Sequence, residues 1–307
     1  MKIAMVSGHF ELPIDSIPIG GVQRHISRVT DELRQRGHSI DWFYPGQRTY
    51  LENANPDIVV AHDFFCFMEE LNCPQICIFH GWEGRCPPDA AVVTRRCMVE
   101  KMADASIHVG DYIGKWYSQK ADRVIYGGVK PVEFVSPPGK NNFLYLGRLE
   151  PDNSPDMFFC ALSMLSIPYT LQVCGNGSLR EYLEGICKTY NINATFHGFV
   201  EDPDSYIKSS DIVFTSGYLS ILEAFINKRP VISAFSNELK KDYLQLMPAQ
   251  TFSYEYPVDI REKFIDILEN GTEESVEKNY EFACSNTWDK VADVYEEMIE
   301  RCLSSRT

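Results

Sequence analysis

The chain has no apolar run long enough to cross a membrane. A spanning helix needs about 20 apolar residues, and no segment of this 307-residue sequence approaches that length. The apolar stretch near the N-terminus is also too short for the core of a signal peptide. We therefore interpret the first residues as a strand, and we expect a cytoplasmic protein without a transmembrane segment.

Positive charge is scarce as well. The sequence has 43 acidic and 29 basic residues, and no run of Lys and Arg is longer than a pair. A protein that binds nucleic acid needs a basic face, so no nucleic-acid partner is expected. We interpret the pairs Arg95-Arg96 and Lys240-Lys241 as solvated helix faces rather than phosphate-binding patches.

The ten cysteines include no C-x-x-C pair. Several of them lie in expected strands or helices, as Cys77 and Cys174 do. This usage is typical of reduced thiols, and it indicates neither a disulfide scaffold nor a zinc site. We therefore expect no bound metal ion.

What the chain does contain is an alternation of strand and helix patterns in two series. The first series has expected strands at 2–6, 39–43, 57–61, 75–79, 105–109 and 123–126. The second has expected strands at 143–146, 169–174, 194–197, 211–215, 230–234 and 250–253. A Pro- and Gly-rich segment, 131–142, separates the series, and an amphipathic helix over 288–302 follows them. This alternation predicts an α/β fold with parallel, doubly wound sheets in two halves.

The most informative segment is Ser209–Ser233, which predicts a strand, a tight loop, a helix and another strand. The expected helix, 219–227, carries a single carboxylate, Glu223, just beyond the end of a buried strand. Open α/β sheets bind their ligands at that edge, and the free N–H groups of a helix N-terminus bind anions. From the residues alone, a solvated surface carboxylate explains Glu223 equally well.

Other segments also have the form of ligand-binding turns. Gly20-Gly21 opens a helix, and His80 ends an expected buried strand. Arg148 lies in the segment Phe143–Glu150, just after the expected strand 143–146. Val173–Ser178 and Phe196–Asp202 are turns after later strands. Each has a structural alternative, namely a plain turn for the glycines, a core residue for His80 and a surface salt bridge for Arg148.

These segments resemble retaining glycosyltransferases of family 4 in the GT-B class, over nearly the whole chain and most strongly over 143–233. The chain is similar to short, loop-trimmed members found in microbial and virus-encoded glycan pathways. The resemblance implies two Rossmann-like domains with doubly wound parallel sheets that face a central cleft. It assigns 1–134 and the helix 288–307 to an acceptor-side domain, and 141–287 to a nucleotide-sugar-binding domain.

The resemblance also implies the residues of the donor site. Arg148 clamps the diphosphate, a task that suits the planar guanidinium, and Glu223 holds the ribose. The donor-binding residues implied in this way are Gly21, Arg148, Asn153, Gly175, Phe199, Val200, Leu219, Ser220 and Glu223. The chain departs from the family pattern at Thr215, where a sugar-contacting Glu is usual, and at Asn153, where a Lys assists the Arg.

His80 and Arg148 are the catalytic residues that the resemblance implies, with Gln23 and Asp63 on the acceptor side. The implied reaction is a retaining transfer of a hexose, from GDP-mannose or secondly from UDP-glucose, to a glycan or glycoprotein. It requires no cofactor besides the nucleotide sugar, which is the donor substrate. The sequence shows no basic amphipathic helix of the kind that docks on lipid, which disfavours a lipid acceptor.

Two alternatives remain open for the function, and a homodimer is left open for the assembly. One alternative is a nucleotide-sugar epimerase on the same fold, which would need acid and base carboxylates around the sugar. Thr215 at the position of the missing Glu speaks against it. The other is a catalytically degenerate module that binds a nucleotide or a partner.

Overall fold

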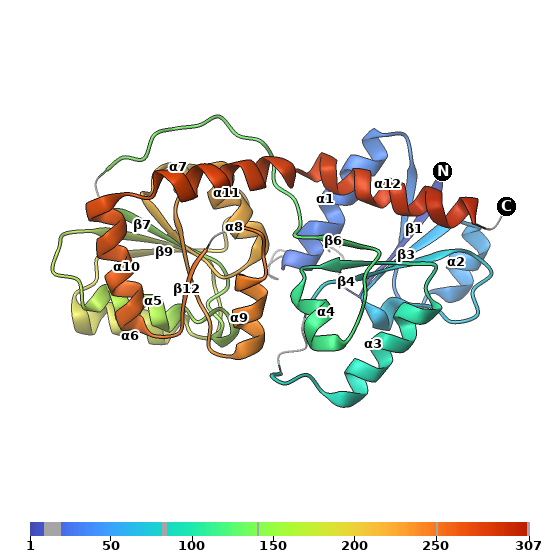
Figure 1. Cartoon of the computed structure of the whole chain (residues 1–307), viewed down its shortest axis with the longest axis horizontal. Coiled ribbons are helices and arrows are strands. Elements are labelled where there is room, and N and C mark those ends of the chain that lie inside the picture. Colours follow the sequence, from blue (N-terminus) through green and yellow to red (C-terminus); the bar gives the residue numbers. More distant parts are fainter. Residues whose placement is uncertain (9–19, 82–84, 140, 250, 306–307) are drawn as a thin grey trace. The chain divides into compact units, whose positions relative to one another are not determined.

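The structure, a computed structural model, describes residues 1–8, 20–81, 85–139, 141–249 and 251–305. Unit 1 comprises Met1–Gly128 and Asn286–Thr307, and unit 2 comprises Val129–Ser285. Each unit has its own parallel sheet and its own helices (Figure 1). The predicted α/β fold with two doubly wound parallel sheets is therefore confirmed.

Unit 1 contains a six-stranded parallel sheet in the order β2-β1-β3-β4-β5-β6. Its strands are β1 (Lys2–Val6), β2 (Ser39–Phe43), β3 (Ile58–His62), β4 (Gln75–Phe79), β5 (Ala105–Val109) and β6 (Arg123–Ile125). Its helices are α1 (Gly21–Gln35), α2 (Arg48–Ala54), η1 (Phe64–Cys66), α3 (Ala90–Met102), α4 (Tyr112–Tyr117) and α12 (Trp288–Ser304). The central strands β3 and β4 are buried along their whole length, as expected for apolar strands covered on both faces.

Unit 2 contains a second six-stranded parallel sheet, in the order β12-β11-β10-β7-β8-β9. Its strands are β7 (Asn142–Leu146), β8 (Thr170–Cys174), β9 (Ala194–Gly198), β10 (Ile212–Phe214), β11 (Val231–Ala234) and β12 (Phe252–Tyr254). The chain builds outward from β7 to β9 and then returns to the other side of β7 with β10. Such a reversal of strand order is where open α/β sheets bind ligands.

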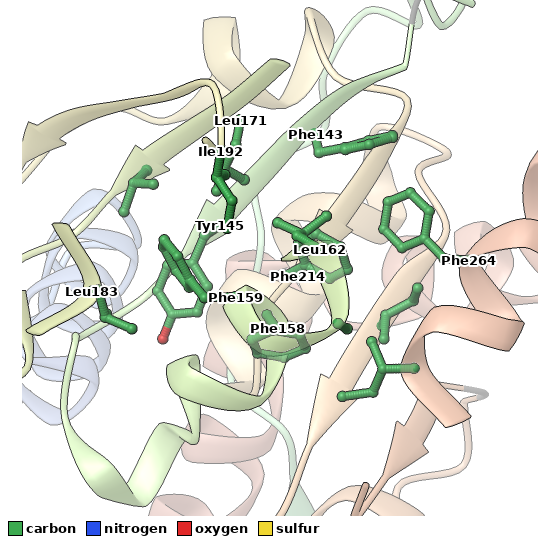
Figure 2. Close-up of a cluster of buried hydrophobic side chains, with 14 of the residues drawn as sticks. Phe143, Tyr145, Phe158, Phe159, Leu162, Leu171, Leu183, Ile192, Phe214 and Phe264 are labelled. Atoms are coloured by element: carbon green, nitrogen blue, oxygen red, sulfur yellow. The ribbon is translucent and has the colours of Figure 1, made fainter. Parts of the chain in front are cut away.

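The helices of unit 2 cover this sheet and supply its core. They are η2 (Pro151–Asn153), α5 (Pro155–Ser163), α6 (Arg180–Tyr190), α7 (Asp204–Lys208), α8 (Tyr218–Ile226), α9 (Glu238–Gln245), α10 (Pro257–Asn270) and α11 (Glu273–Ser285). Figure 2 shows Phe158 from α5 and Phe264 from α10 directed at the rings of Phe143 and Phe214 on the sheet. The Phe143–Phe264 and Phe158–Phe214 ring centroids lie 4.3 and 4.9 Å apart, so these rings are in close contact.

The C-terminal helix α12 packs against α1 within unit 1 (Figure 1). Arg36, at the end of α1, pairs with Asp289, Asp293 and Glu296 of α12 at 2.5, 2.9 and 2.6 Å. Deeper in the interface, the Nε2 atom of His25 lies 2.9 Å from the hydroxyl of Tyr295, and both residues are buried. The last helix is therefore part of the core that surrounds His25.

The prediction that both basic pairs are solvated is wrong for one member of each pair. Arg96 is 0% exposed and Lys240 is 4% exposed. The guanidinium of Arg96 lies over the rings of Phe64, Phe79 and Tyr117, where cation–π attraction and hydrogen bonds offset part of its desolvation. Adjacent residues of a helix face different directions, so a basic pair can have one buried member.

The bounds of the strands and of α12 differ from the predicted ones by at most two residues, which is the usual uncertainty at element ends. Gln250, the expected first residue of the last strand, lies outside the described residues. The same holds for Trp82 and Glu83, which follow His80.

A substitution at Gly128 tests how α12 packs within unit 1, because a Cβ atom at this position would lie 2.6 Å from two ring carbons of Trp288. Gly128→Ala is expected to destabilise unit 1 by about 1–3 kcal/mol through overpacking. Gly46→Ala is the control, since in the described part of the chain nothing besides its sequence neighbours lies within 4 Å of its Cβ position. Urea unfolding followed by tryptophan fluorescence measures both variants. Equal midpoints for the two would contradict this packing.

Candidate functional site

Unit 2 places the expected donor-binding segments along one edge of its sheet. Strands β7, β8, β9 and β10 are parallel neighbours, so their carboxyl ends lie at the same edge. The residues that follow these ends are Arg148 and Asn153 after β7, Gly175 after β8, Phe199 and Val200 after β9, and Leu219, Ser220 and Glu223 after β10. The fold thus brings together eight residues that are far apart in the sequence.

The turns after β7 and β8 are in direct backbone contact. A Cβ atom on Gly175 would lie 1.8 Å from the carbonyl oxygen of Gly147, so only glycine fits at 175. The carboxylate of Glu150 ties the turns together, because it accepts hydrogen bonds from the amide and hydroxyl of Ser178, at 2.8 and 2.6 Å. These bonds hold the pKa of Glu150 below its usual value. The turn that carries Arg148 is therefore built on a rigid base.

Arg148 lies on the surface of unit 2 and forms a salt bridge with Asp152. Its Nη2 atom lies 2.6 Å from Oδ2, and the Arg148 side chain is 56% exposed. Such an exposed pair contributes only about 0–1 kcal/mol, so a phosphate group can compete with Asp152 for the guanidinium. The surface salt bridge that was the structural alternative for Arg148 is thus present in this structure.

Asn153 contributes to the shape of the turn. Its side-chain amide donates to the carbonyl of Arg148 at 3.2 Å. The hydroxyl of Tyr145, which belongs to the core in Figure 2, donates to the same carbonyl at 2.9 Å. Two donors from different elements thus fix the backbone of Arg148. At the position where the resemblance expects a charged Lys, Asn153 therefore provides a hydrogen bond to the backbone and no charge.

Helix α8 begins at the carboxyl end of β10 with no side-chain cap. The amide of its first residue, Tyr218, donates to the hydroxyl of Tyr243 at 2.8 Å. For the next two amides, those of Leu219 and Ser220, no acceptor is found among the residues that the structure describes. Free amides at a helix N-terminus favour an anion. Glu223 lies on the second turn of the same helix and is half-buried.

Lys240 is the residue at this edge that the sequence analysis missed. It extends from α9, and its Nζ atom donates to the carbonyl of Ser216 at 2.6 Å, two residues before α8. Burial lowers the pKa of Lys240 to about 8. Because Lys240 belongs to a basic pair, the sequence analysis interpreted it as a solvated residue. Its position on the helix after β11 is the one sequence signal that indicates a place at this edge.

Phe199 and Val200 follow β9, the edge strand of the sheet. Phe199 is 43% exposed. An exposed ring offers a face on which a nucleobase can stack. Gly198, the last residue of β9, accepts a hydrogen bond from the amide of Gly175 at 2.7 Å, so this segment joins the same group of turns.

Unit 1 buries His80 and Asp63 together at the carboxyl ends of β3 and β4. The carboxylate of Asp63 accepts a hydrogen bond from the amide of His80 at 3.2 Å, and Nη1 of Arg96 lies 3.7 Å from it. Asp63 has a φ of 75°, a backbone conformation that costs a non-glycine residue about 1–3 kcal/mol. The hydroxyl of Tyr112 donates to the carbonyl of His80 at 3.1 Å. Backbone and side-chain bonds therefore fix both residues.

Three imidazole rings form a buried cluster around His80. Its Nε2 atom lies 2.9 Å from Nδ1 of His62, and the ring of His25 packs edge-on against it at 4.9 Å. Burial lowers the pKa of His25 to about 3. Burial and the neighbouring His25 also lower the pKa of His62. The hydrogen bond between His62 and His80 needs an N–H donor on one ring and a bare nitrogen acceptor on the other. With His62 neutral, the tautomer of one ring therefore determines which nitrogen of the other ring carries a proton.

Gly21 and Gln23 lie at the start of α1, in the same unit. Gly21 is exposed, and among the residues that the structure describes nothing besides its chain neighbours and the backbone of its own helix lies within 4 Å of the position where its Cβ atom would be. The space beside Gly21 is therefore open to an approaching ligand. Gln23 is half-buried in the first turn of α1. Their predicted contacts with diphosphate and acceptor stay predictions.

Two open hollows in unit 2, of about 430 and 610 Å³, lie beside β12 and are lined by none of the expected site residues. Across the described ranges, no group of three or more His, Cys, Asp and Glu side chains is arranged to hold a metal ion. Within those same ranges, no helix is both long and apolar enough to cross a membrane.

Residues 130–279 match the family "Glycosyl transferases group 1". This segment falls wholly within unit 2 and covers most of it. The match therefore includes every one of the donor-binding residues predicted between Arg148 and Glu223. No curated protein matches the sequence.

Solved structures of similar fold cover nearly the whole chain. HepE of Anabaena, in complex with UDP and glucose, has a TM-score of 0.75 and 14% identity over 98% of this chain and 99% of that chain. A glycosyltransferase from Rickettsia africae has a TM-score of 0.71 and 13% identity, with 98% of each chain covered. WaaB, a lipopolysaccharide outer core galactosyltransferase, has a TM-score of 0.66 and 15% identity, with 100% of each chain covered. This likeness shows the GT-B fold, and with the family match in unit 2 it supports a GT-B glycosyltransferase.

The buried histidines should make the stability of unit 1 depend on pH. Below pH 6.5 the unfolded chain protonates His25, whereas the folded chain resists protonation down to about pH 3. The free energy of unfolding should therefore decrease as the pH is lowered through this window, by about 1.4 kcal/mol per pH unit. In His25→Gln the loss between pH 7 and pH 5 should be smaller.

Urea unfolding at both pH values measures this difference. All four tryptophans belong to unit 1, so their fluorescence reports on that unit. His197→Gln, at an exposed position in unit 2, is the control and should keep the parent's pH dependence. The same loss in His25→Gln as in the parent would show that His25 is not the titrating group.

Proposed function

We propose that the protein is a retaining glycosyltransferase that transfers a hexose from a nucleoside diphosphate sugar to a glycan or glycoprotein. One observation carries the proposal. The donor-binding residues of unit 2 follow adjacent strand ends, on both sides of the point where the strand order reverses. The match of residues 130–279 to group 1 glycosyl transferases supports the same reading.

Each part of the donor has a matching group on unit 2. The guanidinium of Arg148 and the amides of Leu219 and Ser220 bind the diphosphate. The carboxylate of Glu223 accepts hydrogen bonds from the ribose hydroxyls. The exposed ring of Phe199, with Val200 beside it, covers the base.

Catalysis on this proposal is electrostatic stabilisation of the leaving group. The bond between the anomeric carbon and the phosphate oxygen breaks, and its electron pair stays on that oxygen. The acceptor hydroxyl attacks the anomeric carbon from the same face, and its proton passes to the leaving phosphate. Arg148 and the α8 amides stabilise the added negative charge, and His80 contacts the sugar. This course gives retention without a carboxylate nucleophile.

Two donors are proposed, GDP-mannose and UDP-glucose. The mannose donor follows from the family resemblance of the sequence. The glucose donor gains support from HepE, which has the same fold and forms a complex with UDP-glucose. Phe199 presents a stacking surface that accepts either base, so the two donors are tested side by side.

The test is a calorimetric titration of the whole chain with GDP, UDP, GDP-mannose and UDP-glucose. We expect one diphosphate and its sugar to bind. NMR of the first product formed, by transfer or by slow donor hydrolysis, should show the α-anomer of the donor retained. Binding without turnover on any glycan would favour the binding module, and early β-anomer would overturn the retaining mechanism.

Glu223 and His80 should differ in what their loss affects. Glu223→Ala should weaken donor binding, because the ribose is held alike in the ground and transition states. His80→Ala should lower turnover more than affinity, because contacts at the reacting sugar strengthen as charge develops. Donor affinity and turnover are measured for both variants. Parent-like affinity in Glu223→Ala, or parent-like turnover in His80→Ala, would refute that residue's assignment.

A further inference from the structure

We propose that Lys240 is a second cationic ligand of the donor diphosphate, alongside Arg148. The inference rests on the proposed function, because it assigns a residue to the nucleotide-sugar site of unit 2. It concerns a lysine from α9, a helix to which the sequence analysis assigned no donor-binding residue.

The position of Lys240 is fixed by its own helix. Asn237 caps α9, and its side-chain oxygen accepts a hydrogen bond from the amide of Lys240 at 2.8 Å. The side chain extends inward to the turn between β10 and α8, where its Nζ atom donates to the carbonyl of Ser216 at 2.6 Å. That carbonyl lies three residues before Leu219, the first of the two free amides.

A pair of tyrosines locks α9 onto the start of α8. The rings of Tyr218 and Tyr243 stack at 3.9 Å. The Tyr243 hydroxyl accepts from the amide of Tyr218 at 2.8 Å, and the Tyr218 hydroxyl donates to the carbonyl of Tyr243 at 2.6 Å. The Nζ atom of Lys240 also lies 4.2 Å from the centroid of the Tyr243 ring. The ammonium group and the N-terminal amides of α8 are thus held in one rigid frame.

The charge of Lys240 has no balancing carboxylate in its immediate surroundings. The residue is 4% exposed, and within the described ranges no carboxylate lies within 4 Å of its Nζ atom. Its one oxygen partner is a neutral carbonyl. A buried ammonium in such a setting is costly, and burial accordingly lowers the pKa of Lys240 to about 8. An anion bound nearby would remove this cost.

Lys240 is also within electrostatic reach of Arg148. Asp152 raises the pKa of Lys240 and Arg148 lowers it, so all three charges act on the same region. Arg148 is partly neutralised by Asp152 at 2.6 Å, and Asn153 carries no charge. A diphosphate bears more negative charge than one guanidinium can balance. Lys240 supplies the additional positive charge. It comes from α9, which follows β11, whereas Arg148 follows β7, so the two cations come from the two sides of the point where the strand order reverses.

The test compares Lys240→Met with Lys241→Met in the whole chain. Lys241 is the matched control, because it is adjacent, half-exposed and paired with Glu238 on the surface. Calorimetry measures the affinity for UDP and uridine, or for GDP and guanosine if the parent binds GDP. Lys240→Met should lose about 10- to 100-fold in diphosphate affinity, the scale of one charged hydrogen bond. Its nucleoside affinity should be unchanged, and Lys241→Met should match the parent in both.

A purely structural lysine would give a different result. If Lys240 only supports the Ser216 turn, the ratio of diphosphate to nucleoside affinity should stay constant between pH 7 and pH 9, because a neutral amine still donates to the Ser216 carbonyl, and that result would overturn the inference. Parent-like UDP and GDP binding by Lys240→Met would also overturn it, while the proposed function would stand. A parent that binds neither diphosphate would refute the proposed function together with this inference.

A measurement on the parent protein decides the question if Lys240→Met does not fold. Between pH 7 and pH 9 the free protein loses the proton of Lys240, because burial lowers the pKa of this ammonium group to about 8. Tyr243 stays neutral, because burial raises the pKa of its phenol well above this range. The ratio of diphosphate to nucleoside affinity should therefore fall several-fold, and taking the ratio removes any titration of the base. A constant ratio would overturn the inference.

Discussion

The proposed donor site of unit 2 depends on the contact between two backbone turns, at Gly147 after β7 and at Gly175 after β8. The carbonyl of Gly147 occupies the space that a Cβ atom at 175 would need. The parallel pairing of β7 and β8 sets this approach, since it ends both strands at one level. The backbone of Arg148, whose guanidinium we propose as a diphosphate ligand, is fixed by this contact and by the hydrogen bonds to its carbonyl.

The reversal of strand order adds a second set of groups to the same edge. The turn after β10 lies next to the turn after β7, although 65 or more residues separate them in the sequence. It brings the N-terminus of α8, and α9 packs against that terminus through the tyrosine pair. The edge therefore gathers a guanidinium, two free amides and an ammonium group. A guanidinium and an ammonium group thus meet at this edge in a chain whose net charge is −14.

Most of the fold could be predicted because its signals are local. The alternation of strands and helices and the Pro-rich break identified two parallel sheets, and the strand bounds were nearly right. The strand and helix patterns also placed Arg148 after β7 and Glu223 in the first turns of the helix after β10, where the structure has them. Local signals could not show that Gly175 is required by a distant carbonyl, or that Tyr295 of α12 contacts His25. Both contacts depend on how remote segments pack.

The two buried cations show why the sequence wrongly predicted that both members of each basic pair are solvated. Arg96 and Lys240 are both nearly inaccessible, but their surroundings differ. Arg96 is enclosed by three aromatic rings, bonds to Gln119 and to the carbonyl of Gly81, and faces Asp63. Folding alone accounts for its burial. Among the described residues, Lys240 contacts one carbonyl and one ring, and it lies at the edge of the sheet where open α/β folds bind ligands. A buried charge with so few partners is stabilised best by a bound anion, which is the physical ground for placing a phosphate beside it.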